Sequence, residues 1–409
     1  MTDNYVDFHL KKELPGKKKL WLKMFPKYFS DIKGGQLTLI LPDGDVAKFG
    51  QGKAGSLQAL IKLNSYRPLS ILFAKGDLAF AESYLKGEWE SPDLTALFEF
   101  GLVMETKLKI SSSNSLVLKI INRLLHVLNR NSKNGSRRNI AFHYDLGNNF
   151  YKHWLDKTMT YSSALFNSPT ESLEQAQLNK YSAIEELLDA TKKDRILEIG
   201  CGWGGFSEYI VKSKGSRIEG LTLSKQQLEF ANSRYKNLGI AEHASASYTD
   251  YRDSKGQYDK IVSIEMFEAV GEDNWDIYFK TIHDRLVPSG TAVLQIITID
   301  NERFHSYRKN TDFIQRYIFP GGMLPSLEAL QRAISRNNLK IQYTNFFGTS
   351  YARTCAMWNE RFQTAWPEIE NLGYSKRFKR MWEYYLSYCE AGFKAGSINV
   401  GLYKVTKAA

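Results

Sequence analysis

Hydrophobic and polar positions along the second half of the chain follow two different periods. Short apolar runs predict strands at 217–223, 260–264 and 292–297, and patterns of helical period predict helices between them at 225–237 and 275–286. Strands that alternate with helices in this way form a mainly parallel sheet covered on both faces. Open sheets of this kind bind ligands at the carboxyl ends of their strands. We therefore expect an α/β domain with a ligand site along that edge.

The first 115 residues have a different pattern, which predicts a smaller α+β domain. An apolar stretch at 35–41 runs into Pro42, Asp43 and Gly44, which are residues typical of a hairpin turn. A chain of 409 residues, 43% of them hydrophobic, can bury one large core or two smaller ones. We therefore expect two domains.

Polar stretches mark the boundary between these domains. The composition turns to serine and asparagine over 111–115, and it is polar and basic over 129–139, as in a linker. Between these stretches, residues 116–130 place apolar side chains at helical spacing among basic ones. The predicted organisation is an amino-terminal domain over 1–115, a basic helix and linker over 116–137, and a second domain over 138–409.

The most informative segment is the apolar strand 195–199, which runs into a glycine-dense turn and then a helix. Gly200 and Gly202 lack a Cβ, so the backbone can turn sharply and approach a bound ligand. Gly204 and Gly205 break the G-x-G-x-x-G spacing of a dinucleotide-binding loop. A nucleotide-cofactor loop of another kind is indicated, and a plain glycine turn in an α/β fold is the alternative.

Residues 195–206 resemble motif I of class I methyltransferases that use S-adenosylmethionine (SAM), in which Glu198 would hold the methionine ammonium group. Residues 75–89 resemble the amino-terminal domain of the longer bacterial and plant cyclopropane fatty acid synthases, which methylenate double bonds in phospholipid acyl chains. Further segments resemble that family in the family's order. They are 142–148, 160–164, 221–227, 250–252, 266–271, 316–322 and 382–385. The resemblance implies a Rossmann-like SAM methyltransferase domain after a smaller, lipid-facing domain.

The same resemblance implies a set of residues around SAM. Residues 222–227 would lie along the ribose and methionine, 250–251 beside the adenine, and 161–162 on the opposite side. The full set is Tyr161, Ser162, Leu197, Glu198, Ile199, Gly200, Cys201, Gly202, Trp203, Gly204, Gly205, Thr222, Leu223, Ser224, Lys225, Gln226, Gln227, Asp250 and Tyr251. For Thr222 and Ser224, a helix N-cap is an equally good interpretation.

The chemistry implied by the resemblance calls for a dry, aromatic site. An isolated alkene is a poor nucleophile, so its attack on the sulfonium methyl group needs close alignment and exclusion of water, and it leaves a carbocation on the acyl chain. Aromatic faces can stabilise that cation, although each aromatic residue could equally belong to the core. The candidates are Phe142, Tyr144, Phe166, Tyr317, Phe319 and Tyr351.

Ring closure then requires removal of a proton from the added methyl group. In the family this step is assigned to a bicarbonate ion, with Glu268 orienting the ion or relaying its proton. The positions that would hold the ion are Ser163, Glu268, Gln295, Ile297 through its backbone, and Tyr351. Cys389 matches a cysteine often assigned as catalytic, but the mechanism needs no thiolate, so we prefer a structural role for it.

Several of these positions depart from the best-known bacterial pattern. Ser163 stands where cysteine is usual, Gln295 where histidine is common, Ala269 where histidine follows the glutamate, and Glu265 where short relatives carry glycine. Serine and glutamine can hydrogen-bond an anion, but they cannot carry a proton as histidine does. Glu265, Ala269 and Gln295 look more like the plant-type branch of the family, whereas Ser163 departs from both patterns. These departures leave the identity of the base open.

Charge and cysteine content indicate which kinds of partner and which cellular compartment are compatible with the chain. The formal net charge of +11, from 55 basic and 44 acidic residues, favours an anionic partner, either nucleic acid or an acidic membrane surface. Three scattered cysteines predict neither a disulfide framework nor a metal site, and no apolar run approaches the ~20 residues that span a bilayer. We expect a cytoplasmic protein that associates peripherally with membranes. Segments 17–29 and 116–130 could meet the lipid, or could be ordinary surface helices.

The leading prediction is cyclopropanation of unsaturated acyl chains in phospholipid membranes. The runner-up is methyl transfer followed by a hydride shift, which gives a methylene- or methyl-branched chain. A methyltransferase acting on RNA or a small molecule would need a nucleic-acid module, and none is evident. A noncatalytic lipid-binding protein is disfavoured because cofactor and base positions are both present. A homo-oligomer in which each amino-terminal domain serves a neighbour's site is left open.

Overall fold

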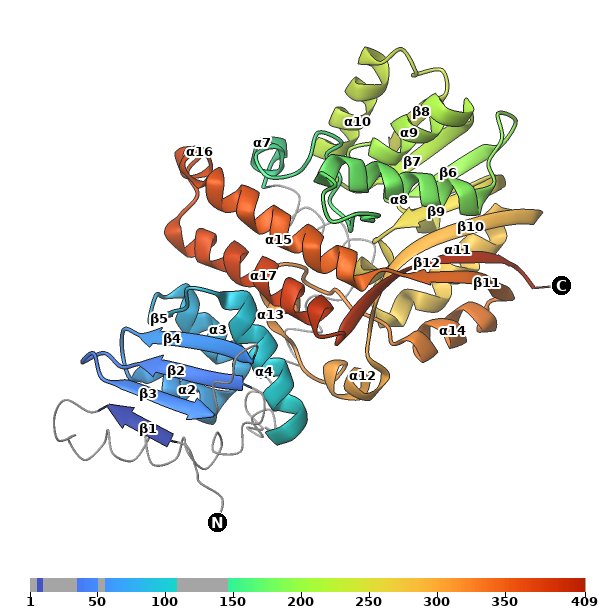
Figure 1. Ribbon diagram of the computed structural model, residues 1–409. Helices are drawn as coiled ribbons and strands as arrows, with labels where there is room; N and C mark the ends of the chain where they lie inside the picture. The colour runs from blue at the N-terminus through green and yellow to red at the C-terminus, as the bar shows by residue number, and fades with distance from the viewer. Residues whose placement is uncertain (1–5, 10–34, 51–55, 109–145, 409) are drawn as a thin grey trace. The chain divides into compact units, whose positions relative to one another are not determined.

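The computed structural model describes residues 6–9, 35–50, 56–108 and 146–408, and they form two compact units (Figure 1). The smaller unit contains the described residues up to 108 together with 373–395. The larger unit contains 146–372 and 396–408. The predicted linker over 116–137, the basic segment 17–29, and the candidate aromatic residues Phe142 and Tyr144 lie outside the described residues.

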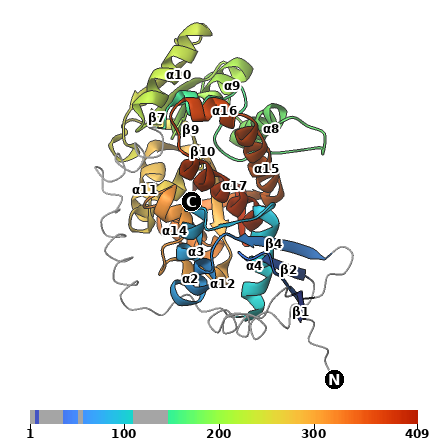
Figure 2. The same ribbon diagram turned by 90° about the vertical axis from the view of Figure 1, so that its left-hand side faces the viewer.

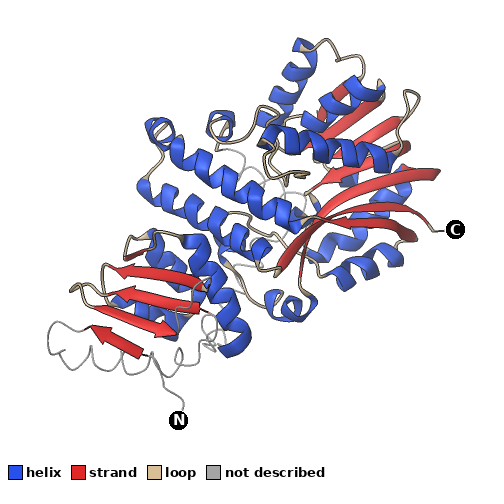
Figure 3. Cartoon of the chain, in the orientation of Figure 1, coloured by secondary structure: helices blue, strands red, loops and turns tan. Residues whose placement is uncertain are grey.

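The smaller unit contains a five-stranded sheet, and the predicted hairpin lies in it (Figure 3). The strand order is β1 (Val6–His9), β3 (Val46–Gly50), β2 (Gly35–Ile40), β4 (Leu57–Leu63) and β5 (Trp89–Glu90). Strand β2 pairs antiparallel with β3, and the Leu41 N–H closes the turn on the Asp45 carbonyl at 2.8 Å. Leu37 and Leu39 are buried while their neighbours are half-buried, as expected of a strand with one face on a core. The predicted α+β class is confirmed.

Helices α2 (Arg67–Lys75), α3 (Asp77–Leu85) and α4 (Leu94–Leu108) complete this unit with α17 (Lys376–Lys394) from near the end of the chain. Tyr84 donates a hydrogen bond to Glu383 at 3.0 Å, and Thr95 donates one to Glu390 at 2.9 Å. Both carboxylates belong to α17. The grouping therefore differs from the predicted domain over 138–409, because residues 373–395 return to the amino-terminal unit through contacts that are remote in sequence.

The larger unit contains a seven-stranded sheet. The strand order is β11 (Leu339–Phe346), β12 (Ile398–Lys407), β10 (Leu286–Ile299), β9 (Tyr258–Ile264), β6 (Arg195–Ile199), β7 (Arg217–Thr222) and β8 (Ala244–Tyr248). Strands β6 to β10 are parallel, and β12 runs antiparallel between β10 and β11. The strands predicted at 217–223, 260–264 and 292–297 are β7, β9 and the central part of β10. The pair β11 and β12 was not predicted.

Helices cover both faces of this sheet. Helix α10 (Lys225–Asn237) has the predicted bounds, and α11 (Trp275–Arg285) ends one residue before its predicted end. Figure 2 shows α8 (Leu173–Leu188) on one side of β9 and β10, with α11 and α14 (Leu327–Arg336) on the other. Leu294 and Ile296 of β10 belong to the core that α11 and α14 complete. Because side chains alternate along a strand, Gln295 points to the opposite face.

The larger unit also contains further helices and single 3-10 turns. They are α7 (Asn148–Lys152), α9 (Gly205–Lys214), α12 (Asn301–Tyr307), α13 (Phe313–Tyr317), α15 (Gly348–Thr364), α16 (Trp366–Asn371) and the single 3-10 turns η1 (Tyr251–Asp253), η2 (Phe267–Ala269) and η3 (Glu272–Asn274). Within the described ranges, no helix combines the length and the apolar character that a bilayer crossing needs.

Candidate active site

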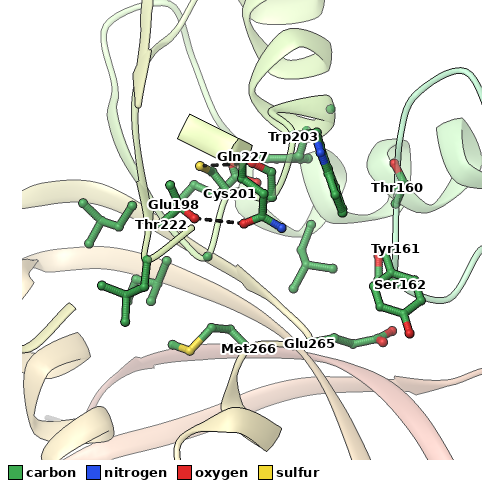
Figure 4. Close-up of a pocket in the computed structure, with 18 of the residues that line it drawn as sticks. Thr160, Tyr161, Ser162, Glu198, Cys201, Trp203, Thr222, Gln227, Glu265 and Met266 are labelled. Carbon is green, nitrogen blue, oxygen red and sulfur yellow. Dashed lines mark hydrogen bonds between the residues drawn. The ribbon is translucent and has the colours of Figure 1, made fainter. Parts of the chain in front are cut away.

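A cavity opens at the carboxyl ends of β6, β7 and β9, where the parallel sheet was expected to bind a ligand (Figure 4). Most of the residues predicted around SAM line it. They are Tyr161, Ser162, Glu198, Ile199, Gly200, Cys201, Gly202, Trp203, Gly205, Thr222, Leu223, Gln227 and Tyr251. The predicted residues outside its lining are Leu197, Gly204, Ser224, Lys225, Gln226 and Asp250. Thr160, Glu265 and Met266 line the cavity without having been predicted to do so.

The glycine-dense turn brings backbone close to the cavity. Gly200, Gly202 and Gly204 have positive φ angles of 85°, 53° and 81°, which other residues rarely adopt. Gly204 is the N-cap of α9, so the turn ends where the helix begins. A Cβ at Gly204 would lie 2.6 Å from the Tyr235 hydroxyl oxygen, whereas a Cβ at Gly202 would have no neighbour within 4 Å. The turn is therefore packed against α10 on one side and open on the other.

Glu198 places a carboxylate at the base of the turn. The residue is 2% exposed, and its carboxylate accepts a hydrogen bond from the Ser207 hydroxyl at 2.5 Å. Burial raises the pKa of Glu198 to about 8, and the Ser207 bond and the Lys180 charge oppose the rise. A ligand cation would supply the partner charge that this buried carboxylate needs. Glu198 is thus suited to hold an ammonium group.

At the end of β7, Thr222 and Gln227 form a polar pair. The Thr222 hydroxyl donates to the Gln227 side-chain oxygen at 2.9 Å, which leaves the Gln227 amide NH2 for a ligand (Figure 4). The Ser224 hydroxyl accepts from the Gln227 N–H and caps α10, the alternative considered for it above. The Gln226 side-chain oxygen accepts from the Asn148 N–H at 3.1 Å. Gln226 therefore anchors the loop before α7.

Tyr251 lines the cavity, and Asp250 caps the 3-10 turn η1 that carries it. The Asp250 carboxylate pairs with the Arg252 guanidinium at 2.7 Å and also accepts from the Arg252 N–H. Tyr251 packs edge-on against Tyr278, with ring centroids 5.5 Å apart. Leu197 has a different place, because its side chain belongs to the core on the α11 and α14 face.

The residues predicted to act on the substrate meet around Glu265. Its carboxylate accepts from the Ser163 N–H at 2.8 Å, the Gln295 side-chain amide at 2.6 Å and the Tyr351 hydroxyl at 2.5 Å. Ser163 precedes α8, Gln295 lies in β10 and Tyr351 lies in α15, so three distant segments converge on one side chain. Figure 4 shows the Glu265 carboxylate turned toward Tyr161 and Ser162. The resemblance implied no site role for Glu265, although its identity matches the plant-type branch better than the short relatives.

Glu268 lies beside this cluster on η2. One carboxylate oxygen accepts from the Ile297 N–H at 2.6 Å, and the other is buried with no hydrogen-bond donor among the described residues. Burial, followed by the negative charge of Glu265, raises the pKa of Glu268 to about 8. Glu268 therefore carries a proton at neutral pH.

Lys180 on α8 contacts Ser162 of the cavity lining and was not predicted. It is fully buried, and its ammonium group donates to the Ser162 hydroxyl at 2.8 Å. Burial lowers the pKa of Lys180 to about 7, while the carboxylates of Glu265, Asp156 and Glu198 oppose that change. Lys180 shares a helix face with Leu173 and Ile184, so the sequence places a lysine on an apolar face. That placement is the signal from which its burial could have been predicted.

Aromatic rings gather around Tyr161. Its ring lies 5.4 Å from Trp154, 5.2 Å from Trp358 and 6.4 Å from Phe319, and Tyr351 lies 6.1 Å from Trp358 between ring centroids. Two of the predicted aromatic candidates, Phe319 and Tyr351, thus join this cluster.

The remaining candidates lie in other contacts. The guanidinium of Arg353 sits 4.0 Å from the ring centroid of Phe166, and Tyr317 packs against Phe313. Cys389 is a half-buried thiol on α17 in the smaller unit and is absent from the cavity lining. Within the part of the chain that the structure describes, no three His, Cys, Asp or Glu side chains cluster as metal ligands.

Comparisons with known proteins agree with this geometry. Residues 131–402 match the family model described as mycolic acid cyclopropane synthetase. The tuberculostearic acid methyltransferase UfaA1 of Mycobacterium tuberculosis is 36% identical, with 89% of this chain and 86% of that protein covered. The cyclopropane-fatty-acyl-phospholipid synthase of Escherichia coli is 35% identical, with 85% of this chain and 87% of that protein covered.

Solved structures match the larger unit's architecture. The cyclopropane synthase MmaA2 from Mycobacterium tuberculosis has a TM-score of 0.63 at 27% identity, with 66% of this chain and 98% of that chain covered. The mycolic acid cyclopropane synthase CmaA1, solved with S-adenosylhomocysteine (SAH), also has a TM-score of 0.63, at 28% identity, with 66% of this chain and 98% of that chain covered. The predicted family and Rossmann-like fold are confirmed, and the chain belongs to the cyclopropane synthase family of SAM-dependent methyltransferases.

Proposed function

We propose that this protein transfers a one-carbon unit from SAM to the double bond of unsaturated acyl chains in membrane phospholipids, forming a cyclopropane ring. The observation that carries the proposal is the position of Glu265. It lines the same cavity as Glu198 and the glycine turn, and it is bonded to three of the residues predicted to act on the substrate. The glycine turn proposed to bind SAM and a buried carboxylate therefore share one cavity.

The residues present fit SAM and suit the reaction. When bound, SAM supplies an electrophilic methyl group on a sulfonium centre. Glu198 would hold its ammonium group, and the Gln227 amide would bind its ribose hydroxyls. Tyr161 lines the cavity, and Trp358 and Phe319 pack against its ring. This apolar cluster would exclude water, and Tyr161 would present a ring face to a developing cation beside the alkene.

Replacing Glu198 by glutamine should weaken binding of SAH, which keeps the ammonium group, by roughly tenfold to a hundredfold. The variant loses a charge-assisted hydrogen bond in a buried site, which contributes about 1.5–3 kcal/mol. Isothermal titration calorimetry measures the change, with Glu242→Gln, an exposed glutamate, as the control. Unchanged affinity in Glu198→Gln would show that another group holds the ammonium.

The proposed reaction is tested with pure protein, SAM and vesicles of an unsaturated phospholipid. Mass and double-bond analysis of the acyl chains should show a gain of one methylene unit together with loss of the alkene. The same gain with the alkene retained would identify the second candidate product. No gain in any lipid would overturn the proposal.

A methylene- or methyl-branched chain is the second candidate product. It is supported by the similarity to a protein named as a tuberculostearic acid methyltransferase, which is 36% identical to this chain, against 35% for a cyclopropane-fatty-acyl-phospholipid synthase. Both products start from the same cation. They differ in whether a hydride shifts along the chain before the proton leaves.

We also propose that the protein acts in the cytoplasm at the surface of the membrane, with phospholipid rather than nucleic acid as its partner. The net charge of +11 supports attraction to an anionic surface. Co-sedimentation should then show tighter binding to anionic than to zwitterionic vesicles. High salt should weaken this binding, since the Debye length falls to about 3 Å at 1 M. Equal binding to both kinds of vesicle would contradict a charge-driven contact.

A further inference from the structure

Bicarbonate, the proton acceptor that the family resemblance implies, does not fit the site that this chain builds. Its expected donors are already bonded to protein. The Ser163 N–H, the Gln295 amide and the Tyr351 hydroxyl all donate to the two oxygens of Glu265. The Ile297 N–H donates to Glu268 instead. A side-chain carboxylate thus takes the hydrogen bonds that an added anion would need.

We propose that the carboxylate of Glu265 is itself the general base that removes the proton from the transferred methyl group. The inference rests on the proposed function, because it names the base of that same reaction. Glu265 lines the cavity on the side where Tyr161 and Ser162 face it (Figure 4). Carboxylate and bicarbonate share the chemistry that matters here, namely two oxygens that accept hydrogen bonds and then a proton.

The backbone at Glu265 supports a functional role. Its φ angle is +50°, in the left-handed region that disfavours residues with a Cβ. The resemblance places glycine at this position in short relatives, and glycine adopts this conformation without strain. Strained residues held by their surroundings cluster at active sites. A glutamate here is held in place by bonds to its carboxylate.

The distribution of charge also favours Glu265 as the base. Glu265 accepts three hydrogen bonds and is attracted by the positive charge of Lys180, whereas the Glu268 carboxylate accepts one hydrogen bond, from the Ile297 N–H. Burial raises the pKa of Glu265, and Tyr351, Ser163, Lys180 and Gln295 oppose the rise. Two neighbouring buried carboxyls do not both ionise readily. The pair therefore places its negative charge on Glu265 and its proton on Glu268.

The step balances without another reactant. The alkene π pair forms a bond to the methyl carbon as the carbon–sulfur bond breaks, and the electrons of that bond remain on sulfur. A Glu265 oxygen then takes a proton from the new methyl group. The released C–H pair forms the third side of the ring and quenches the cation. Glu265 ends as a neutral carboxylic acid and returns its proton to solvent before the next turnover.

The test compares wild-type protein, Glu265→Gln and Glu265→Gly on vesicles of dioleoyl phosphatidylglycerol with SAM. Each is assayed in carbonate-free buffer and with added bicarbonate. Wild type should turn over equally in both. Glu265→Gln should lose roughly 10²–10⁴-fold in rate in both, because its amide fills the space without accepting a proton. Glu265→Gly should be as slow without bicarbonate and recover at least about tenfold with it, because the freed donors can then hold the ion.

Each outcome supports or overturns the proposal. SAH binding by calorimetry shows that the variants are folded, and Glu242→Gln controls for a glutamate lost elsewhere. Wild-type activity that falls on removal of bicarbonate would overturn the proposal, as would full activity of Glu265→Gln. A glycine variant that bicarbonate does not rescue would show that Glu265 does not take the place of the ion. Wild type that modifies no lipid at all would instead overturn the proposed function.

Discussion

Replacing Glu268 by glutamine should stabilise the protein at alkaline pH, by about 3–5 kcal/mol near pH 9, and change its stability little near pH 5. The folded-state pKa of Glu268 is raised from 4.5 to about 8 by burial and by Glu265. Between these values the folded protein retains a proton that the unfolded chain has lost. Wild-type stability therefore falls as pH rises through this window, by up to about 1.4 kcal/mol per pH unit. Glutamine has no proton to lose.

Urea unfolding of wild type and Glu268→Gln near pH 5, 7 and 9 measures this effect. Glu198 has a similarly raised pKa, but it is present in both proteins and cancels in the difference. Glu242→Gln, an exposed change, should leave the pH dependence of unfolding unaltered. Parallel stability curves for wild type and Glu268→Gln would mean that Glu268 is ionised in the folded protein.

Replacing Gly204 by alanine should destabilise the protein without ligand by about 3 kcal/mol, whereas Gly202→Ala should cost about 1 kcal/mol. Both glycines have positive φ angles, so both changes add backbone strain. Only at Gly204 does the new Cβ meet the Tyr235 ring, with contacts of 2.6–2.9 Å to its hydroxyl oxygen and two ring carbons. Tyr235 is 1% exposed and cannot move freely. The clash accounts for the difference.

Denaturant unfolding measures the free energy of unfolding of both variants. Gly202→Ala reports the backbone strain alone, and Gly204→Ala reports that strain together with the clash against Tyr235. Because the cofactor turn must shift to relieve the contact, Gly204→Ala should also bind SAH more weakly. Equal destabilisation by both alanines would contradict the close packing of the turn on α10. Removing the Tyr235 ring relieves the clash, so Gly204→Ala combined with Tyr235→Leu should recover part of the stability that Gly204→Ala loses.

The part of the fold that local patterns encode was predicted well. Helix α10 has its predicted bounds because Ser224 caps its start and its pattern is local. The strands β7 and β9 are short segments that lie between predicted helices. Strands β11 and β12 were not predicted, since they become strands by pairing with each other and with β10 across long stretches of intervening helices. The return of α17 to the smaller unit likewise depends on remote partners such as Tyr84.

Most of the residues that the motifs name line the cavity, and their roles remain predictions. The glycine turn, Glu198 and Gln227 line the cavity as the resemblance implied. Glu265 was missed as a hub because its role depends on a left-handed backbone that aims its carboxylate at Ser163 and Gln295. The sequence alone does not show in which direction the Glu265 side chain points. Lys180 was missed because a lysine in a helix is usually exposed. Only the structure shows that this one is completely buried.

The most direct measurement is the fate of the label when the pure protein is given SAM with a fully deuterated methyl group and vesicles of an oleoyl phospholipid. Mass and double-bond analysis of the acyl chains reports both the carbon added and the proton lost. We expect a ring carbon that retains two of its three deuterium atoms, with the alkene gone, because Glu265 removes one of them. Unlabelled lipids after complete incubation, with SAM still bound by the protein, would contradict lipid methylenation.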